Sequence, residues 1–276
     1  MGGMGNPPPE PVIADLDEVW SATAEGCSGL REDEWDRATD CPGWSVKDQL
    51  SHLIGIERAL LGEVAPPLAG PVPPHVRNPI GEINEGWIEA RRPVPGDAVL
   101  EEFVEVTRRR LDDLSASPPE RFDVVGWSPV GDVPYREFME VRVFDSWVHE
   151  QDARRALGRP GDRFGRGEAV TLSRMVGALP YIIGRQVAPP DGTTVVVEIT
   201  GPTGRRVAVG VEGKRARQLE AAPGDPDVTL TLDAMTFWRL CCGRVPPDQA
   251  LDGGEVEVGG DAELARRVVG AMNIMV

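Results

Sequence analysis

Two of the three histidines in this chain stand where metal ligands could stand. His52 lies in a segment with helical patterning, and His149 closes the run Asp145-Ser-Trp-Val-His149. Residues four apart on a helix share one face, so the Asp145 and His149 side chains would project together. His52, from a facing helix, would complete a His/carboxylate/His set with one position left open. Catalytic zinc sites have this form, with three protein ligands and room for water or substrate.

A plainer interpretation fits the same residues. Histidine and aspartate four apart on a helix are common as simple charge pairs, and His52 could be a histidine satisfied at the surface or in the core of a helical bundle. The residues alone leave both interpretations open. The third histidine, His75, lies in Pro73-Pro-His-Val-Arg, so we predict an exposed loop residue and exclude it as a ligand.

The composition excludes several classes of partner. The formal charge is −16, whereas nucleic acids and anionic membranes attract basic proteins. The four cysteines form no C-x-x-C pair, which favours a reducing compartment. The first ten residues lack the charged and apolar regions of a secretory signal, and no apolar run approaches the length of a membrane span. We therefore expect a cytoplasmic protein with a short disordered leader.

The first half of the chain has the patterning of a helical bundle. Apolar residues recur at three- and four-residue spacings, and Ser45 with Asp48 three positions later predicts a helix start. A proline-rich stretch at about 65–79 predicts a loop. Several helices with short joins predict an antiparallel four-helix bundle; the helices are expected at about 14–30, 45–61, 80–92, 97–114 and 135–157.

The second half has the patterning of a small α+β domain. A helix at about 167–183 precedes runs of alternating β-branched residues, and Gly201-Pro-Thr-Gly204 predicts the turn between the first two strands. Expected strands are 194–200, 206–211, 228–232 and 256–258, and expected helices are 234–242 and 262–271. We therefore predict two domains, a metal-binding helical bundle at 12–160 and a small α+β domain at 161–276.

Several motifs resemble one family. The stretch Cys41-Pro-Gly-Trp-Ser-Val-Lys-Asp-Gln-Leu-Ser-His52-Leu resembles the first metal-ligand helix of the mycothiol-dependent maleylpyruvate isomerase family, which belongs to the DinB-like metal-binding four-helix bundles. Further segments of this chain resemble the later helices of that family and its smaller, sterol-carrier-like C-terminal domain, so the resemblance covers most of the chain. These pieces are Asn84-Glu85 with Arg91, Arg142–Asp152, Pro190-Asp-Gly192, Gly201-Pro202, Gly243-Arg244 and Gly259–Ala265.

The resemblance implies a metal site and a reaction. Carried over residue by residue, the metal triad falls on His52, Asp145 and His149. Family members often carry Glu where this chain has Asp145, which is shorter by one methylene and must bind from a closer backbone. The expected cofactor is Zn²⁺ or another divalent metal, with mycothiol as co-substrate. The family mechanism implies that the metal holds the thiol as thiolate, which adds to a small electrophilic substrate and gives isomerisation or thiol transfer.

Further candidate residues carry plainer alternatives. Arg142 could be a catalytic residue that anchors a carboxylate of thiol or substrate, or simply a paired arginine. Asn84 and Trp44 are candidates for binding the thiol, or else ordinary helix-surface and core residues. Arg244, in the second domain with Arg239, could reach an anionic substrate at a domain cleft, where ligand sites are common, or could be a solvated arginine.

Two rival functions remain open at this stage. A metal-dependent hydrolase would use the open position to activate water. A non-catalytic metal-binding module would have that position closed by a fourth ligand, for which Cys41, Glu150 and Asp152 are the candidates. We expect a monomer or homodimer with small-molecule partners and with neither nucleic acid nor membrane.

Overall fold

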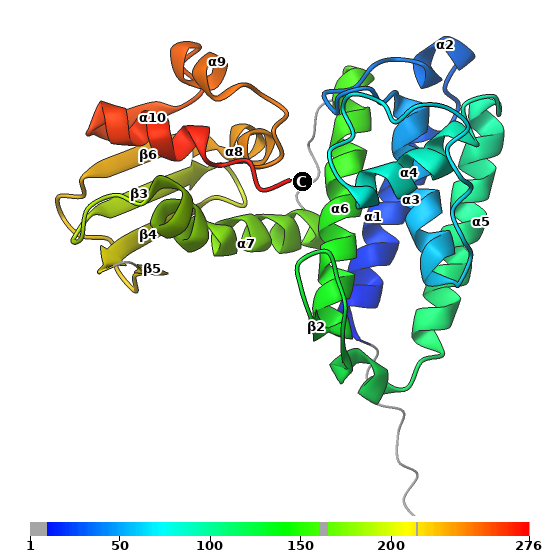
Figure 1. Ribbon diagram of the computed structural model, residues 1–276, viewed down its shortest axis with the longest axis horizontal. Coiled ribbons are helices and arrows are strands. Elements are labelled where there is room, and N and C mark those ends of the chain that lie inside the picture. Colours follow the sequence, from blue (N-terminus) through cyan, green and yellow to red (C-terminus); the bar gives the residue numbers. More distant parts are fainter. Residues whose placement is uncertain (1–9, 160–164, 214, 276) are drawn as a thin grey trace, which may run out of the picture. The chain divides into compact units, whose positions relative to one another are not determined.

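The computed structural model describes residues 10–159, 165–213 and 215–275 (Figure 1). The chain divides into two compact units, Met1–Gly167 and Glu168–Val276. The predicted domain boundary at 160/161 and the predicted disordered leader both fall outside the described residues, so both stay predictions. None of the helices in the described ranges combines the length and the apolar character that crossing a membrane requires.

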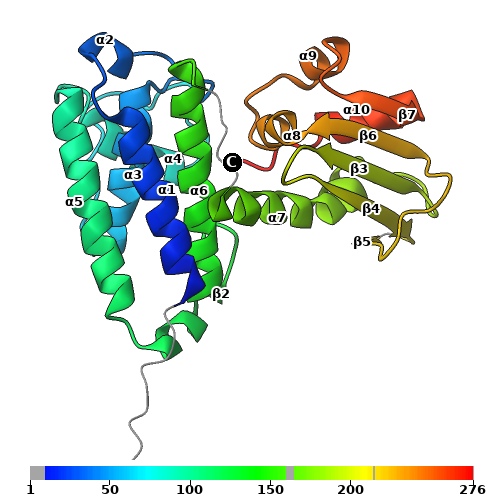
Figure 2. The same cartoon turned by 180° about the vertical axis from the view of Figure 1, so that it is seen from behind.

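The N-terminal unit is built on four long helices, which confirms the predicted bundle. Helices α1 and α3 each pack against both α5 and α6. Helices α1 and α6 run in one direction and α3 and α5 in the other, as Figures 1 and 2 show. The bundle helices are α1 (Pro11–Cys27), α3 (Val46–Leu60), α5 (Gly96–Ser115) and α6 (Tyr135–Ala156). Packed on α3 is α4 (Pro79–Glu89), and shorter elements are α2 (Glu32–Trp35), η1 (Pro119–Asp123), β1 (Val125–Gly126) and β2 (Val133–Pro134).

The start of α3 is fixed by the predicted cap. The Asp48 backbone N–H donates to Ser45 Oγ at 3.3 Å, and the Ser45 backbone N–H donates to Asp48 Oδ2 at 3.0 Å. This reciprocal capping box satisfies two groups that a helix end leaves unpaired. Leu50, Leu53 and Ile54 are fully buried in the bundle. The cap and this apolar face together fix the rotation of α3, and hence the direction in which His52 points.

Helix α6 is buried on most of its circumference, so it carries polar groups into the core. Val143 and Val148 are fully buried, as an apolar core position requires, but Ser146 is equally buried. Ser146 Oγ accepts a hydrogen bond from Trp20 Nε1 of α1 at 3.0 Å. Buried polar groups need such partners. The other polar side chains of α6, described below, find theirs on α3 and α5.

The C-terminal unit is the predicted α+β domain, built on a five-stranded sheet of order β5-β4-β3-β6-β7. Strand β3 pairs antiparallel with β4 through the predicted Gly201–Gly204 turn, and parallel with β6. Helices α8 and α10 pack on β6, and η2 packs on β4 and β5. The elements are α7 (Arg166–Tyr181), η2 (Ile182–Val187), β3 (Thr194–Thr200), β4 (Arg205–Glu212), β5 (Arg215–Gln218), β6 (Val228–Asp233), α8 (Ala234–Cys241), α9 (Pro247–Asp252), β7 (Glu257–Gly260) and α10 (Ala262–Gly270).

The close approach of α4 to α3 can be tested at Gly55. A Cβ at this position would lie within 2.6 Å of three Trp87 atoms. We expect Gly55→Ala to destabilise the N-terminal unit by about 1–3 kcal/mol, as overpacking does, and calorimetry should show a lower Tm. Gly177→Ala, on an exposed face of α7 with open space around it, is the control and should stabilise by about 0.5–1 kcal/mol. An unchanged Tm for Gly55→Ala would contradict the close packing.

Candidate metal centre

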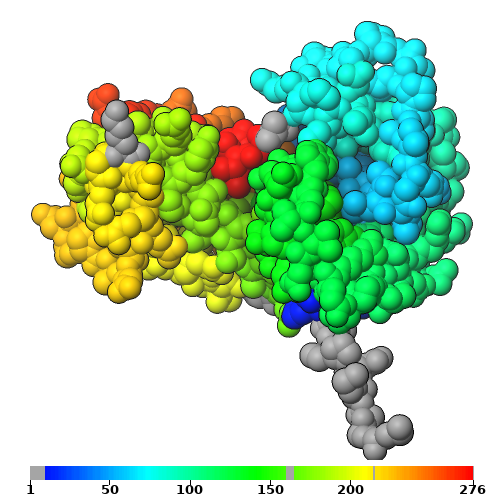
Figure 3. Space-filling view, turned by 60° about the horizontal axis from the view of Figure 1, so that its bottom comes forward, coloured from blue at the N-terminus to red at the C-terminus, as the bar shows by residue number. Residues whose placement is uncertain are grey.

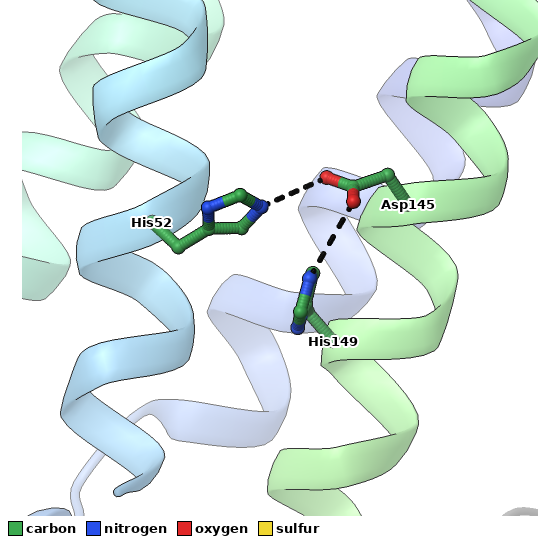
Figure 4. Close-up of side chains that lie close together, drawn as sticks. All are labelled: His52, Asp145 and His149. Carbon is green, nitrogen blue, oxygen red and sulfur yellow. Dashed lines mark hydrogen bonds and ion pairs between the residues drawn. The ribbon is translucent and has the colours of Figure 1, made fainter. Parts of the chain in front are cut away.

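Three side chains from two facing helices converge inside the bundle. His52 comes from α3, and Asp145 and His149 come from α6 (Figure 4). One ligand atom from each lies within 4.8 Å of the others, and among the described residues this is the one group of His, Cys, Asp and Glu side chains placed to hold a metal ion. The structure therefore brings together the three residues that the sequence singles out. Neither Cys41, Glu150 nor Asp152 belongs to the group.

The separations within this group suit a small divalent cation. His52 Nε2 lies 3.1 Å from Asp145 Oδ2, and His149 Nε2 lies 3.5 Å from Asp145 Oδ1. Ligands at about 2.0–2.1 Å from a tetrahedral zinc ion lie about 3.3 Å from one another. The observed separations bracket that value. The shorter Asp145 side chain therefore does not prevent the carboxylate from reaching both imidazoles.

A chain of hydrogen bonds sets the tautomer of His149. Its Nδ1 lies 2.5 Å from Gln49 Oε1, and Gln49 Nε2 donates to Thr39 Oγ1 at 2.7 Å. The Thr39 hydroxyl in turn donates to the Trp44 carbonyl at 2.8 Å. Because the hydroxyl donates its one proton to that carbonyl, its oxygen accepts a hydrogen bond from the Gln49 amide N–H. The Gln49 amide oxygen therefore faces His149 and accepts a hydrogen bond from Nδ1–H. The Nε2 lone pair of His149 then faces Asp145, which is the arrangement of a metal-ligating histidine.

His52 is held neutral by its surroundings. Burial lowers its pKa from 6.5 to about 4, and this effect outweighs the Asp145 carboxylate, which would raise the pKa. The side chain is only 5% exposed, and its Nδ1 has no hydrogen-bond partner in the described structure. A neutral imidazole is the form that binds metals. His52 is therefore already in its ligating form at neutral pH.

Asp145 stays ionised because of its neighbours. Burial alone would raise its pKa, but the charge of Arg142, aided by the neighbouring His52 and His149 side chains, holds the pKa well below the ordinary value. Arg142 Nη1 donates to Asp145 Oδ2 at 2.6 Å. Charge-assisted bonds of this length are among the stronger hydrogen bonds in proteins. The carboxylate is thus available as an anionic ligand whose position is fixed by an arginine three residues earlier.

Arg142 begins a chain of buried ion pairs that leads away from the site. Arg142 Nε donates to Glu57 Oε1 at 2.9 Å, and Arg110 Nε donates to Glu57 Oε2 at 3.1 Å. The Glu57 side chain is 1% exposed and that of Arg110 is fully buried. Arg110 continues to Asp113 at 2.7 Å and to the Tyr135 hydroxyl at 2.7 Å. Each buried charge in the chain therefore has at least one partner of opposite sign.

The outer end of this chain lies beside the β1–β2 hairpin. Tyr135 and Arg121 help to line a cavity of about 210 Å³ beside this hairpin. The hairpin exposes Val124, Val125 and Trp127. Figure 3 shows this part of the chain, in green, on the surface of the bundle. The ion-pair chain thus joins the candidate metal centre to the bundle surface.

The aromatic ring of Trp44 lies over both histidines. Its centroid is 5.0 Å from that of His52 and 5.5 Å from that of His149, and the two imidazoles are 4.6 Å apart. The structure therefore places this predicted thiol-binding residue as a wall of the candidate centre. Asn84 lies on α4, where its Oδ1 is buried without a hydrogen-bond partner among the described residues. Their roles stay predictions.

The arginines predicted in the second domain have partners within their own unit. Arg244 Nη1 donates to the Cys242 carbonyl at 3.0 Å, and Arg239 Nη1 lies 2.9 Å from Glu255 Oε2. A role for Arg244 in catalysis stays a prediction. The prediction that His75 is exposed is wrong, because its side chain is only 22% exposed and pairs with Glu85.

Sequence reasoning missed the residues that orient the ligands. Gln49 contacts His149, Thr39 contacts Gln49, and Glu57 contacts Arg142, in each case only because the chain packs as it does. Gln49 lies three residues before His52, so the i,i+3 spacing on α3 was the available signal. Asp152, three residues after His149 on the same helix, is not the group that orients the ring, because its Oδ2 lies 3.7 Å from Nδ1, beyond hydrogen-bond distance. Gln49 fills that role.

The depressed pKa of His52 predicts how stability depends on pH. Between about pH 4 and 6.5 the unfolded chain protonates this histidine and the folded chain does not, so acid favours unfolding. In metal-free protein this linkage removes about 3 kcal/mol as the pH falls through that window. We expect His52→Gln to abolish most of the dependence in urea unfolding followed across this range. Equal slopes for the two proteins would contradict the neutral, buried imidazole.

Comparison with known proteins identifies the family of both parts of the chain. Residues 16–154 match the family of the mycothiol maleylpyruvate isomerase N-terminal domain, and residues 169–267 match that of its C-terminal domain. The solved mycothiol-dependent maleylpyruvate isomerase is 19% identical, with a TM-score of 0.56 over 95% of this chain and 98% of its own. A mutant of that enzyme matches with 18% identity and a TM-score of 0.55 over the same shares. These likenesses show the fold.

Other matches are more distant or partial. Uncharacterized proteins from two strains of Mycobacterium tuberculosis are 25% identical over 200 residues, covering 71% of this chain and 75% of theirs. The match to the sterol carrier protein 2 of Yarrowia lipolytica covers 38% of this chain and 88% of that protein, with 14% identity and a TM-score of 0.29. The two domain families together account for most of the sequence. The chain therefore belongs to the mycothiol-dependent maleylpyruvate isomerase family, as the sequence motifs predict, and is an enzyme of that type.

Proposed function

We propose that this enzyme uses a bound divalent metal, with zinc as the first candidate, and mycothiol or a similar small thiol to isomerise or thiolate a small electrophile. The observation that carries the proposal is the convergence of two imidazoles and one carboxylate at separations that suit a metal ion. Nickel, manganese and iron suit the same donors. Maleylpyruvate, the substrate in the name of the structural relative, is the first electrophile to test.

The residues that would hold the metal are His52 and His149 through Nε2 and Asp145 through its carboxylate. Three protein ligands leave a fourth position for a small molecule. When bound there, a divalent cation lowers the pKa of a coordinated thiol and so supplies a thiolate at neutral pH. Asp145 retains 18% exposure while both histidines are below 6%. Access for the thiol is therefore best on the side of the carboxylate.

The surrounding residues would orient the ligands and the thiol. Arg142 fixes Asp145 and, because its Nη2 is buried without a hydrogen-bond partner in the described structure, has a donor left for a carboxylate of thiol or substrate. Trp44 would cover the two imidazoles and exclude water from the thiolate. Asn84 would offer its amide to the thiol, and Arg244 would provide a cation for an anionic substrate. Each of these roles is open to substitution experiments.

Metal content tests the ligand set directly. Purified wild-type protein equilibrated with zinc should contain nearly one ion per chain by elemental analysis, and His149→Ala should contain almost none. Gln49→Ala removes no ligand but deletes the hydrogen bonds to His149 Nδ1 and to Thr39, so its zinc affinity should fall by about 10- to 100-fold. His75→Ala, which removes the histidine outside the group, is the control and should retain the metal. Wild-type protein that neither takes up zinc nor gains stability from it would contradict the proposed site.

Thiol dependence tests the reaction class. With maleylpyruvate as substrate and zinc bound, turnover should require mycothiol and should saturate with its concentration, because the thiolate is the nucleophile. Omission of the thiol should reduce the rate to background, and His52→Ala should do the same in its presence. Turnover that is unchanged without thiol, and yields a hydrolysed product, would instead identify a metal-dependent hydrolase.

A further inference from the structure

The histidine that the metal site does not use lies in a second polar cluster behind Trp44. His75 Nε2 is 2.7 Å from Glu85 Oε1, and Trp44 Nε1 donates to the same oxygen at 2.6 Å. Arg92 Nη2 lies 3.4 Å from Glu85 Oε2. The Glu85 side chain is fully buried. One carboxylate on α4 thus gathers donors from the Trp44 turn, from the proline-rich loop and from the end of its own helix.

Such a carboxylate is costly unless its partners stay in place. A buried ionised group loses its hydration and is stable only where charged or hydrogen-bonding groups replace the water. A buried indole N–H likewise needs an acceptor. The contact between Glu85 and Trp44 satisfies both groups at once. Rotation of the indole away from Glu85 would take this acceptor from the indole N–H and one of three donors from the carboxylate, so the contact restricts the orientation of Trp44.

The His75 ring also packs against the turn that carries Trp44. Gly43 has φ +80°, a conformation that favours glycine, and a Cβ there would lie 2.5 Å from the His75 ring. The loop backbone makes a second close approach at Gly86 of α4, where a Cβ would collide with the Pro66 carbonyl. The loop of residues 61–78 therefore contacts α4 at two points, Pro66 and His75. Of these two residues, His75 is the one that shares a carboxylate oxygen with Trp44.

We propose that Glu85 is a positioning residue for Trp44, and that His75 fastens the 61–78 loop to the same carboxylate, so that this pair sets the wall over the two metal-site imidazoles. The inference rests on the proposed function for its effect on the thiol, but the contacts themselves do not depend on it. In the contacts described above, Glu85 touches neither His52 nor His149 nor Asp145. It acts through the indole, whose ring lies beside both His52 and His149.

The contact can be measured without any activity. In a ¹⁵N NMR spectrum the Trp44 indole N–H, assigned with Trp44→Phe, should resonate downfield because it donates to a carboxylate. Glu85→Gln keeps the shape but makes the acceptor neutral, and should move this resonance upfield. Glu82→Gln, an exposed glutamate on the same helix, is the matched control and should leave it in place. If the chemical shift of the Trp44 indole N–H is the same in Glu85→Gln and in the wild type, the proposal is overturned.

Kinetics then separate positioning from a structural role. Glu85→Gln should raise the KM for the thiol by about tenfold, in line with the loss of one hydrogen bond to a charged group, while kcat changes by less than about twofold. His75→Ala removes no buried charge, so this variant should fold and can be assayed even if Glu85→Gln does not fold. It should raise the same KM and speed amide exchange in the 61–78 loop. An unchanged KM in both variants would overturn the role in thiol binding.

Failure of this inference is distinguishable from failure of the proposed function. Cobalt(II) added in place of zinc should shift the Trp44 indole resonance through its unpaired electrons, and Glu85→Gln should change that shift. If cobalt(II) does not bind, the metal site is wrong, yet the resonance of the metal-free protein still tests the Glu85–Trp44 contact. If cobalt(II) binds but the indole shift is the same in both proteins, the positioning role is wrong and the metal site stands.

Discussion

The N-terminal unit depends on the pairing of charges that lie inside it. Glu57 on α3 accepts from Arg142 on α6 and from Arg110 on α5, so a single carboxylate joins three of the four bundle helices. None of these side chains is more than 5% exposed. A buried charge that loses its partner destabilises a protein far more than a surface charge does. The mutual register of the three helices is therefore tied to these contacts.

The same contacts determine the geometry of the candidate metal centre. Arg142 bonds to Glu57 with Nε and to Asp145 with Nη1, so the carboxylate that faces both imidazoles is placed by the residue that holds α6 against α3. Since α3 carries His52, a shift between these two helices would change both the ion pairs and the ligand separations. The contacts that pack α6 against α3 therefore also fix the positions of the candidate ligands, although these come from distant segments of the chain.

Most elements of the fold and the pairing of Asp145 with His149 on one helix face were predictable because their signals are local, whereas the addition of His52 to the candidate set rested on the family resemblance. The Ser45 cap, the helical spacing of apolar residues and the i,i+4 pair of Asp145 and His149 can all be seen within one segment. Gln49 had only its i,i+3 spacing from His52 as a signal, because its hydrogen bond to His149 joins residues a hundred positions apart. Glu57 and the surroundings of His75 could not be predicted, because their contacts form only when the helices and the loop pack together. Likewise, alternation predicts strands but not that β3 pairs parallel with β6.

The polar interior is difficult to explain as a device for stability alone. Replacing buried ion pairs with apolar residues of similar volume is often neutral or stabilising, and the neutral His52 has a buried Nδ1 without a partner in the described structure. Its Nε2 faces the carboxylate, and the tautomer of His149 directs a second Nε2 lone pair to the same place. An arrangement that directs two imidazole nitrogens and an anion toward one point is less favourable than an apolar core until a cation occupies that point. Metal binding would explain why these buried polar groups are kept, because the free energy of binding would offset their unfavourable contribution to stability.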